Sequence, residues 1–105
     1  MRSYRFHPLA VAELYESAAY YQEISPDLGD DFRVKIEQSV TKIRLNPLIH
    51  PLHGRKGFRK CFVKRFPYAI YFRVIDDLIF ISAISHQSRR RNYWIHRKWA
   101  GESPR

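Results

Sequence analysis

The chain has 105 residues, 45% of them hydrophobic and 15% aromatic, which is typical of one globular domain and not of a disordered chain. Its longest nearly apolar run (78–84) is too short to cross a bilayer, and its N-terminus lacks a signal-peptide pattern. The single Cys61 allows no internal disulfide and fits no zinc motif. We therefore expect a cytoplasmic protein. The formal net charge of +9 favours a polyanionic partner, such as nucleic acid, the ribosome or an acidic protein.

The N-terminal half predicts one strand followed by two helices. Residues 3–6 alternate and are β-prone, and Pro8 then suits the first turn of a helix that runs through a segment rich in helix formers. Ser25-Pro26 is a second helix start, with a hydroxyl N-cap and proline at the first helical position. Apolar residues recur at three- and four-residue steps from there to Asn46-Pro47, which ends the helix. The short connection predicts an antiparallel helical hairpin.

The C-terminal half predicts a loop and three strands. Residues 46–57 contain two prolines and two glycines, and the β-like runs 58–63, 68–75 and 78–85 follow, with Asp76-Asp77 as a two-residue turn. The fold class is therefore α+β in the order β-α-α-β-β-β, with the helical hairpin packed on a small antiparallel sheet. We expect a single domain over residues 1–105 with a basic tail at 86–105.

Alternation along the strands separates two faces of the predicted sheet. The apolar face, which would receive the helices, comprises Cys61, Val63, Ile70, Phe72, Val74, Ile79, Ile81 and Ala83. The other face is mixed and expected to be open, with Lys60, Tyr71, Arg73, Phe80 and Ser82. Arg59 falls on the apolar face, which places it at the sheet margin or implies a bulge.

The excess positive charge lies in the second half of the chain. Residues 51–105 hold thirteen Lys and Arg against three Asp and Glu, whereas residues 1–50 hold six against seven. Counting outward from the turn at 76–77 sets Tyr68 opposite Ser85, and a loop at 64–67 pairs Val63 with Tyr68. Both connections bring two basic segments to one end of the sheet. The expected cluster consists of Lys64, Arg65, His86 and Arg89–Arg91.

This residue set excludes several mechanisms. No carboxylate pair is placed for glycoside cleavage or for a magnesium site, no Ser or Cys has an evident His-acid partner, and no phosphate-binding glycine loop is present. What remains suits phosphodiester binding and metal-free RNA cleavage, in which a base activates the 2′-hydroxyl and cations stabilise the phosphate. The candidates are His86 as acid or base, Arg65 or Arg90 on the phosphate, and Tyr93 or Trp94 stacked on a base.

Each candidate also has a purely structural interpretation. His86 can simply end a strand through a backbone hydrogen bond, and Arg65 can be an exposed loop charge. Tyr93 and Trp94 can be packing anchors for the tail. Arg89–Arg91 can be a solvated run, although three adjacent cations repel each other and so favour an anionic partner.

The segments FRKCFVKRFPYAIYFRV and ISHQSRRRNYW, with Tyr20-Tyr21 and the Asn46-Pro47 break, resemble the RelE/ParE superfamily of bacterial toxins over about residues 3–94. These are the toxins of type II toxin–antitoxin modules, often described as plasmid stabilisation proteins. The resemblance implies two helices on a small antiparallel sheet and a growth-arresting toxin bound by an acidic antitoxin. RelE-like members cut mRNA on the ribosome without a metal, whereas ParE-like members poison DNA gyrase and need no nuclease residues.

The resemblance bears on individual positions as well. Arg65 is similar in position to a phosphate-binding arginine of the nucleases, and Arg90 or Arg91 and Tyr93 match their C-terminal arginine and tyrosine. The His86 segment, in contrast, is similar to a ParE-like ending in which Asp-Pro often stands in place of Arg91-Asn92. We therefore expect a toxin that cleaves mRNA on the ribosome, or alternatively a gyrase inhibitor without catalysis or a non-toxic RNA-binding module. No cofactor or metal is expected. The expected catalytic residues are Arg65, His86, Arg90 and Tyr93, and the expected nucleic-acid-binding residues are Lys60, Lys64, Arg73, Arg89, Arg91 and Trp94.

Overall fold

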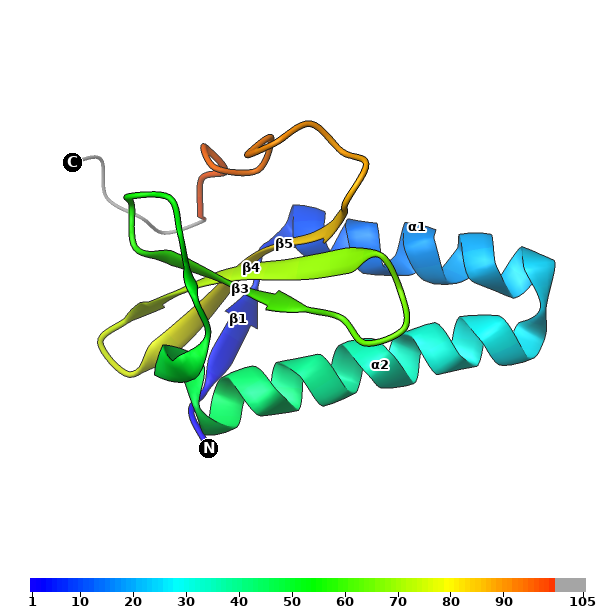
Figure 1. The fold of residues 1–105 in the computed structure, drawn as a ribbon, viewed down its shortest axis with the longest axis horizontal. Helices are drawn as coiled ribbons and strands as arrows, with labels where there is room; N and C mark the ends of the chain where they lie inside the picture. Colours follow the sequence, from blue (N-terminus) through cyan, green and yellow to red (C-terminus); the bar gives the residue numbers. More distant parts are fainter. Residues whose placement is uncertain (100–105) are drawn as a thin grey trace.

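The computed structural model describes residues 1–99, so the last part of the expected basic tail, residues 100–105, lies outside the described residues. The expected order of elements is confirmed, with one additional short strand and a 3₁₀ turn in the loop after the helices (Figure 1). The elements are β1 (Tyr4–Phe6), α1 (Pro8–Ile24), α2 (Pro26–Leu45), η1 (Pro47–Ile49), β2 (Leu52–His53), β3 (Phe58–Phe62), β4 (Tyr68–Ile75) and β5 (Leu78–His86).

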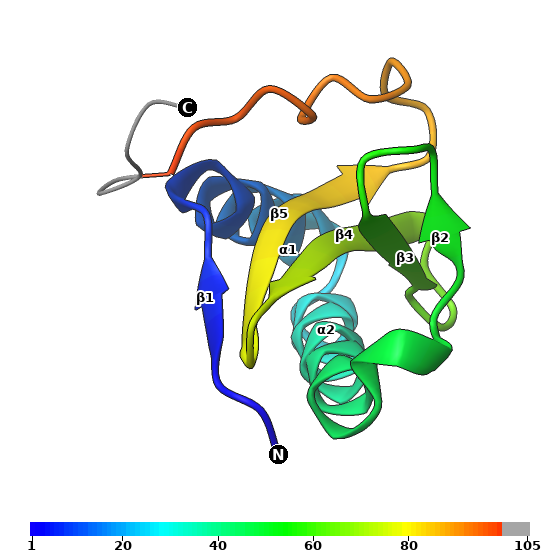
Figure 2. The ribbon, with the colours of Figure 1, turned by 90° about the vertical axis from the view of Figure 1, so that its left-hand side faces the viewer.

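The sheet is mixed, which corrects the expectation of a purely antiparallel one. Its strand order is β1-β5-β4-β3-β2, and β2 to β5 are antiparallel neighbours, but β1 pairs with β5 in parallel (Figure 2). The helices and three strands separate β1 from β5 in the chain, so no tight turn forces these two strands to run in opposite directions.

The two helices start as the prolines indicate, but their caps differ from expectation. Pro8 and Pro26 each occupy the first helical turn. Ser25 is the N-cap residue of α2, yet its hydroxyl makes no capping hydrogen bond. At α1 the cap is His7, whose Nδ1 accepts a hydrogen bond from the backbone N–H of Leu9 at 3.0 Å. A ring nitrogen therefore satisfies one of the free N–H groups at the start of α1.

The main core lies between the helical hairpin and one face of the sheet. Its fully buried members include Phe32, Ile36 and Ile43 of α2, and Ile70 and Phe72 of β4. α1 packs beside β5, while α2 lies toward β3. Within residues 1–99, no helix has both the length and the apolarity that crossing a bilayer requires.

The strand register agrees with the prediction near the turn and departs from it by one residue beyond a bulge. Ile75 pairs with Leu78 as expected, and Val63 N–H donates to the carbonyl of Tyr68 at 2.9 Å. An irregularity between Tyr71 and Phe72 shifts the pairing of β4 with β5, so that Tyr68 lies opposite His86 and not opposite Ser85. A bulge adds one residue to one strand, which alternation alone does not reveal.

The bulge also moves residues between faces. Ala83 was expected on the helix-facing side, but it packs with Phe58 and Trp94 on the opposite face, and Ile84 takes the core position instead. Arg59 stays on the apolar side at the margin of the sheet. Its guanidinium donates to the carbonyls of Leu48 and His50.

The second face of the sheet was expected to be open, but it is covered. The segment after β5 passes over it (Figure 2), and Trp94 is buried there with 1% of its surface exposed. Its ring stacks on Tyr71 with centroids 4.5 Å apart and meets Phe58 edge-on at 4.8 Å. The outer face therefore carries a small second core that the tail itself completes.

Candidate anion-binding site

A cationic pocket lies on the outer face of the sheet, beneath the segment that follows β5. Its volume is about 350 Å³, and its walls come from β2, β3, β4, the end of β5 and the turn beyond it. Among residues 1–99, no carboxylate lines it. The lining residues are His53, Lys60, Phe62, Ala69, Tyr71, Ser85, His86, Gln87, Arg89–Arg91, Asn92 and Trp94.

Backbone hydrogen bonds fix the start of the turn that carries Arg89–Arg91. Gln87 N–H donates to the carbonyl of Pro67 at 2.9 Å, which ties the turn to the loop between β3 and β4. Ser88 N–H donates to Nδ1 of His86 at 3.0 Å. Because Nδ1 accepts a hydrogen bond, a neutral His86 carries its proton on Nε2. His86 thus combines a place on the pocket wall with a role in ending the strand.

A side-chain hydrogen bond fixes the other end of the same turn. Asn92 has a φ of +59°, a left-handed conformation that asparagine tolerates better than most residues. His53 Nε2 donates to Asn92 Oδ1 at 2.7 Å, and His53 is itself buried with 8% exposure. The buried ring of His53 meets Tyr71 at a centroid distance of 4.8 Å. The arginine turn is therefore held at both ends by groups of the sheet.

The pocket is lined by charged side chains and, beneath them, by aromatic side chains of the sheet. Arg89–Arg91 are exposed, and Lys60 is half-buried with its ammonium 5.3 Å from the ring centre of Phe62. Burial raises the pKa of the Tyr71 phenol, and the positive charge of Arg91 opposes that rise. The Arg91 charge therefore acts directly on the pocket floor.

Lys64 and Arg65 were expected to join this cluster. Their loop does lie at the expected end of the sheet, next to the segment after β5, but their side chains face the helices. Arg65 forms an ion pair with Asp31 of α2, and Lys64 lines a separate groove along α2. The hydrogen bond from Lys35, and then the charge of Arg65, hold the pKa of the Asp31 carboxyl below its ordinary value. Arg65 also has a φ of +75°, a left-handed conformation unusual for a residue with a side chain.

Arg73, Tyr93 and Trp94 are occupied by packing. The Arg73 guanidinium lies 4.6 Å from the ring centre of Phe58, and the near-complete burial of Trp94 makes it a packing residue and not a base-stacking platform. The Tyr93 hydroxyl donates a hydrogen bond to Glu13. Burial, followed by this bond, raises the pKa of Tyr93 to about 12.

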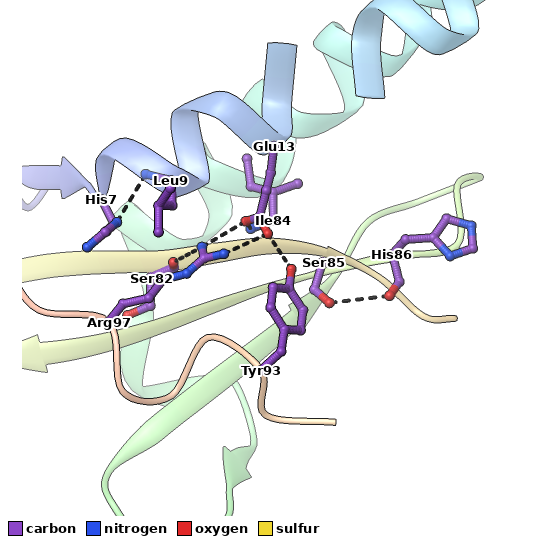
Figure 3. A network of polar contacts seen from close by, with 9 residues as sticks. All are labelled: His7, Leu9, Glu13, Ser82, Ile84, Ser85, His86, Tyr93 and Arg97. Carbon is purple, nitrogen blue, oxygen red and sulfur yellow. Dashed lines mark hydrogen bonds and ion pairs between the residues drawn. The ribbon is translucent and has the colours of Figure 1, made fainter. Parts of the chain in front are cut away.

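Glu13 of α1 stands at the centre of a network that sequence reasoning missed (Figure 3). β1 pairs with residues 79–81 of β5 and then ends, which leaves the next part of the β5 edge without a strand neighbour. The Glu13 carboxylate accepts from Ile84 N–H there at 3.0 Å, and Arg97 donates to the carbonyl of Ser82 at 2.9 Å. Glu13 and Arg97 also form an ion pair. This network ties helix, strand and tail together where the sheet edge would otherwise be open.

The residues that sequence reasoning missed left only weak signals. Glu13 interrupts an otherwise apolar stretch of α1, and Asn92 was noted only as a departure from the resemblance. His53 and Arg97 had no distinguishing pattern. Of the candidate residues, the pocket brings together Lys60, His86, Arg89–Arg91 and Trp94; Lys64, Arg65, Arg73 and Tyr93 point elsewhere.

The chemistry of the pocket is anion binding. Its guanidinium groups are suited to bidentate contact with phosphate or carboxylate, and Tyr71 and Trp94 lie among its lining residues. Within residues 1–99, no group of three His, Cys, Asp or Glu side chains is placed to hold a metal ion.

Comparisons with known proteins agree with this fold. The family model described as "ParE toxin of type II toxin-antitoxin system, parDE" matches residues 4–91. A solved structure described as "Chromosomal ParDE TA system from P. aeruginosa" is similar with a TM-score of 0.73 and 22% identity, covering 82% of this chain and 96% of that one. At this identity the structural likeness supports the fold alone. The search of curated proteins found no match.

Proposed function

The chain belongs to the ParE toxin family of type II toxin–antitoxin systems, and from that premise we propose that it arrests growth by binding and inhibiting DNA gyrase, without a chemical step of its own. The family match over residues 4–91 carries this proposal, because gyrase is the target that ParE-like toxins poison. Its partner in the cell is an acidic antitoxin, in keeping with the net charge of +9.

The placement of the expected nuclease residues also supports inhibition without catalysis. Metal-free RNA cleavage needs several free polar groups around one phosphate. Arg65 is paired with Asp31, and the Tyr93 hydroxyl is bonded to Glu13, so neither group is directed into the cationic pocket. Tyr93 also has its pKa raised to about 12, which makes its phenol a poor proton donor or acceptor near neutral pH.

Two assays test the proposal. Purified protein added to gyrase and relaxed plasmid should abolish supercoiling, and induction in cells should stop thymidine incorporation before methionine incorporation. The variant Arg65→Ala/Tyr93→Phe removes two of the four expected catalytic residues, the two that point away from the pocket, and should still arrest growth. Normal gyrase activity at toxin excess, together with early loss of methionine incorporation, would show that gyrase is not the target.

The second candidate function is metal-independent cleavage of mRNA on the ribosome. One observation favours it: His86, whose imidazole is the side chain most often used as a general acid or base, lines the same pocket as Lys60 and Arg89–Arg91. Under this function His86→Ala abolishes arrest and mRNA fragments appear on induction. A non-toxic RNA-binding module, the third alternative, predicts no arrest at all.

A further inference from the structure

We infer that the pocket beneath the arginine turn clamps the phosphodiester backbone of DNA, so that the toxin contacts the DNA held by gyrase as well as the enzyme. The inference rests on the proposed function and specifies the ligand of this site. It draws on the geometry of the pocket, on the anchoring of the turn at both ends and on the gathering of Lys60 and Arg89–Arg91 in the lining, where residues 1–99 contribute no carboxylate.

The site presents its positive charge at fixed positions. The Arg89 guanidinium lies 4.0 Å from the ring centre of Tyr93, whose hydroxyl is anchored on Glu13. The turn is held at its start by His86 and at its end by the hydrogen bond between Asn92 and His53. A charged loop held in this way loses little conformational freedom when a ligand binds, so more of the interaction energy is available as affinity.

Charge spacing favours a nucleic-acid backbone over an acidic peptide. Lys60 and Arg89–Arg91 line one pocket of about 350 Å³. Duplex DNA carries one negative charge per about 1.7 Å of its axis, whereas an extended peptide advances about 3.3 Å per residue and has a carboxylate only at some positions. A dense cluster of guanidinium groups is therefore neutralised more completely by phosphates, which arginine also binds in bidentate fashion.

His53 and Asn92 act as positioning residues for this clamp. His53 is buried below the turn at the edge of the pocket, and its ring N–H holds Asn92 and with it the C-terminal end of Arg89–Arg91. His53→Phe keeps an aromatic ring against Tyr71 and Trp94 but removes the N–H donor. His53→Gln restores a donor on a side chain of similar reach.

The experiment measures binding of a fluorescein-labelled 20-base-pair DNA duplex by anisotropy over a series of salt concentrations. Arg90→Ala/Arg91→Ala should lower affinity at low salt by about tenfold or more and reduce the magnitude of the log–log salt slope by about 2, since each lost phosphate contact removes about 0.9. The control, Lys64→Ala/Arg65→Ala, makes the same change in net charge on the helix side of the molecule and should leave affinity within about twofold of wild type.

Three results would overturn the inference. Equal losses in the two double variants would mean that binding follows net charge and not the pocket. Displacement of the duplex by poly-glutamate at equal charge concentration would assign the pocket to an acidic protein. Unchanged binding by Arg90→Ala/Arg91→Ala would leave the pocket without a role. For the positioning pair, His53→Phe should weaken binding severalfold, and His53→Gln should restore it; wild-type affinity in His53→Phe would refute the positioning role.

The same variants separate this inference from the proposed function. If Arg90→Ala/Arg91→Ala binds DNA normally while the wild-type protein inhibits gyrase, the inference about DNA binding is wrong and gyrase inhibition stands. If Arg90→Ala/Arg91→Ala loses DNA binding and the wild-type protein leaves gyrase active, the pocket still binds the DNA backbone, but gyrase is not the target and the DNA is not held by gyrase.

Discussion

Glu13 and Arg97, 84 positions apart in the chain, form a bidentate ion pair. Each terminal guanidinium nitrogen of Arg97 lies 3.0 Å from a carboxylate oxygen of Glu13. Each side chain is only 11% exposed. Removing one partner from such a pair leaves a charge in a poorly hydrated place, which is much more costly than the loss of a surface contact.

Glu13→Gln should therefore lower the free energy of unfolding by about 3–5 kcal/mol, the range for breaking a buried pair. Chemical denaturation monitored by circular dichroism measures the loss. Glu16→Gln, at an exposed position of the same helix, is the matched control and should change stability by less than about 0.5 kcal/mol. Equal effects of the two substitutions would show that the Glu13 pair does not stabilise the fold.

The raised pKa of Tyr93 predicts a loss of stability at high pH. Burial and the Glu13 bond raise its pKa to about 12 in the folded protein, against about 10 in the unfolded chain. Because its pKa is higher in the folded protein, Tyr93 contributes stability that is fully present below about pH 10 and is lost as the pH rises toward 12. The expected decline is of order 2 kcal/mol, because one pKa unit corresponds to about 1.4 kcal/mol.

Unfolding experiments between pH 9 and 12 on wild type and Tyr93→Phe test this expectation. Tyr21 also has a pKa raised to about 12, so both proteins should lose stability, and the difference between them isolates Tyr93. Parallel curves for the two proteins across this range would contradict the assignment.

The burial of Trp94 against the sheet predicts that the segment after β5 contributes to the stability of the fold. Trp94→Ala should cost about 3–5 kcal/mol, as for other large aromatic residues truncated in a core. Tyr20→Ala, which truncates a residue 62% exposed on α1, provides the comparison and should cost much less. Thermal unfolding measures both. A small effect at Trp94 would mean that the outer face does not need the tail.

Gly29→Ala should destabilise the protein, although alanine normally has a higher helix propensity than glycine. A Cβ at Gly29 would lie 2.8 Å from Cβ and 3.0 Å from Cα of Gln22, so α1 and α2 could not keep their present separation. Gly29→Ala gains about 1 kcal/mol of helix propensity, and overpacking typically costs about 1–3 kcal/mol, so we expect net destabilisation. Gln38→Ala, exposed on the same helix, controls for propensity alone. An increase in stability for Gly29→Ala would show that the hairpin can widen without cost.

The sequence predicted the elements well because proline, turn residues and hydrophobic spacing are local signals. The helices start at Pro8 and Pro26 as expected, and the turn at Asp76 has the positive φ, +54°, that a tight hairpin favours. The parallel partner of β1 and the bulge depend on contacts between distant segments, and no local pattern encodes them.

The candidate site was predicted in part for the same reason. Strand order placed the basic segments at one end of the sheet, and His86 and Arg89–Arg91 do share a pocket with Lys60. Side-chain direction is set by partners that lie far away in the chain. Asp31 holds Arg65 and Glu13 holds Tyr93, and both carboxylates looked like ordinary helix residues.

The carboxylate and guanidinium that occupy the flank of β5 have a consequence for the behaviour of the protein at high concentration. An unpaired strand flank is a template for another chain, and here its polar backbone groups at Ser82 and Ile84 are already occupied by side chains. The outermost strands that remain, β1 and β2, span only three and two residues. Among residues 1–99, strand-to-strand aggregation therefore has little backbone on which to begin.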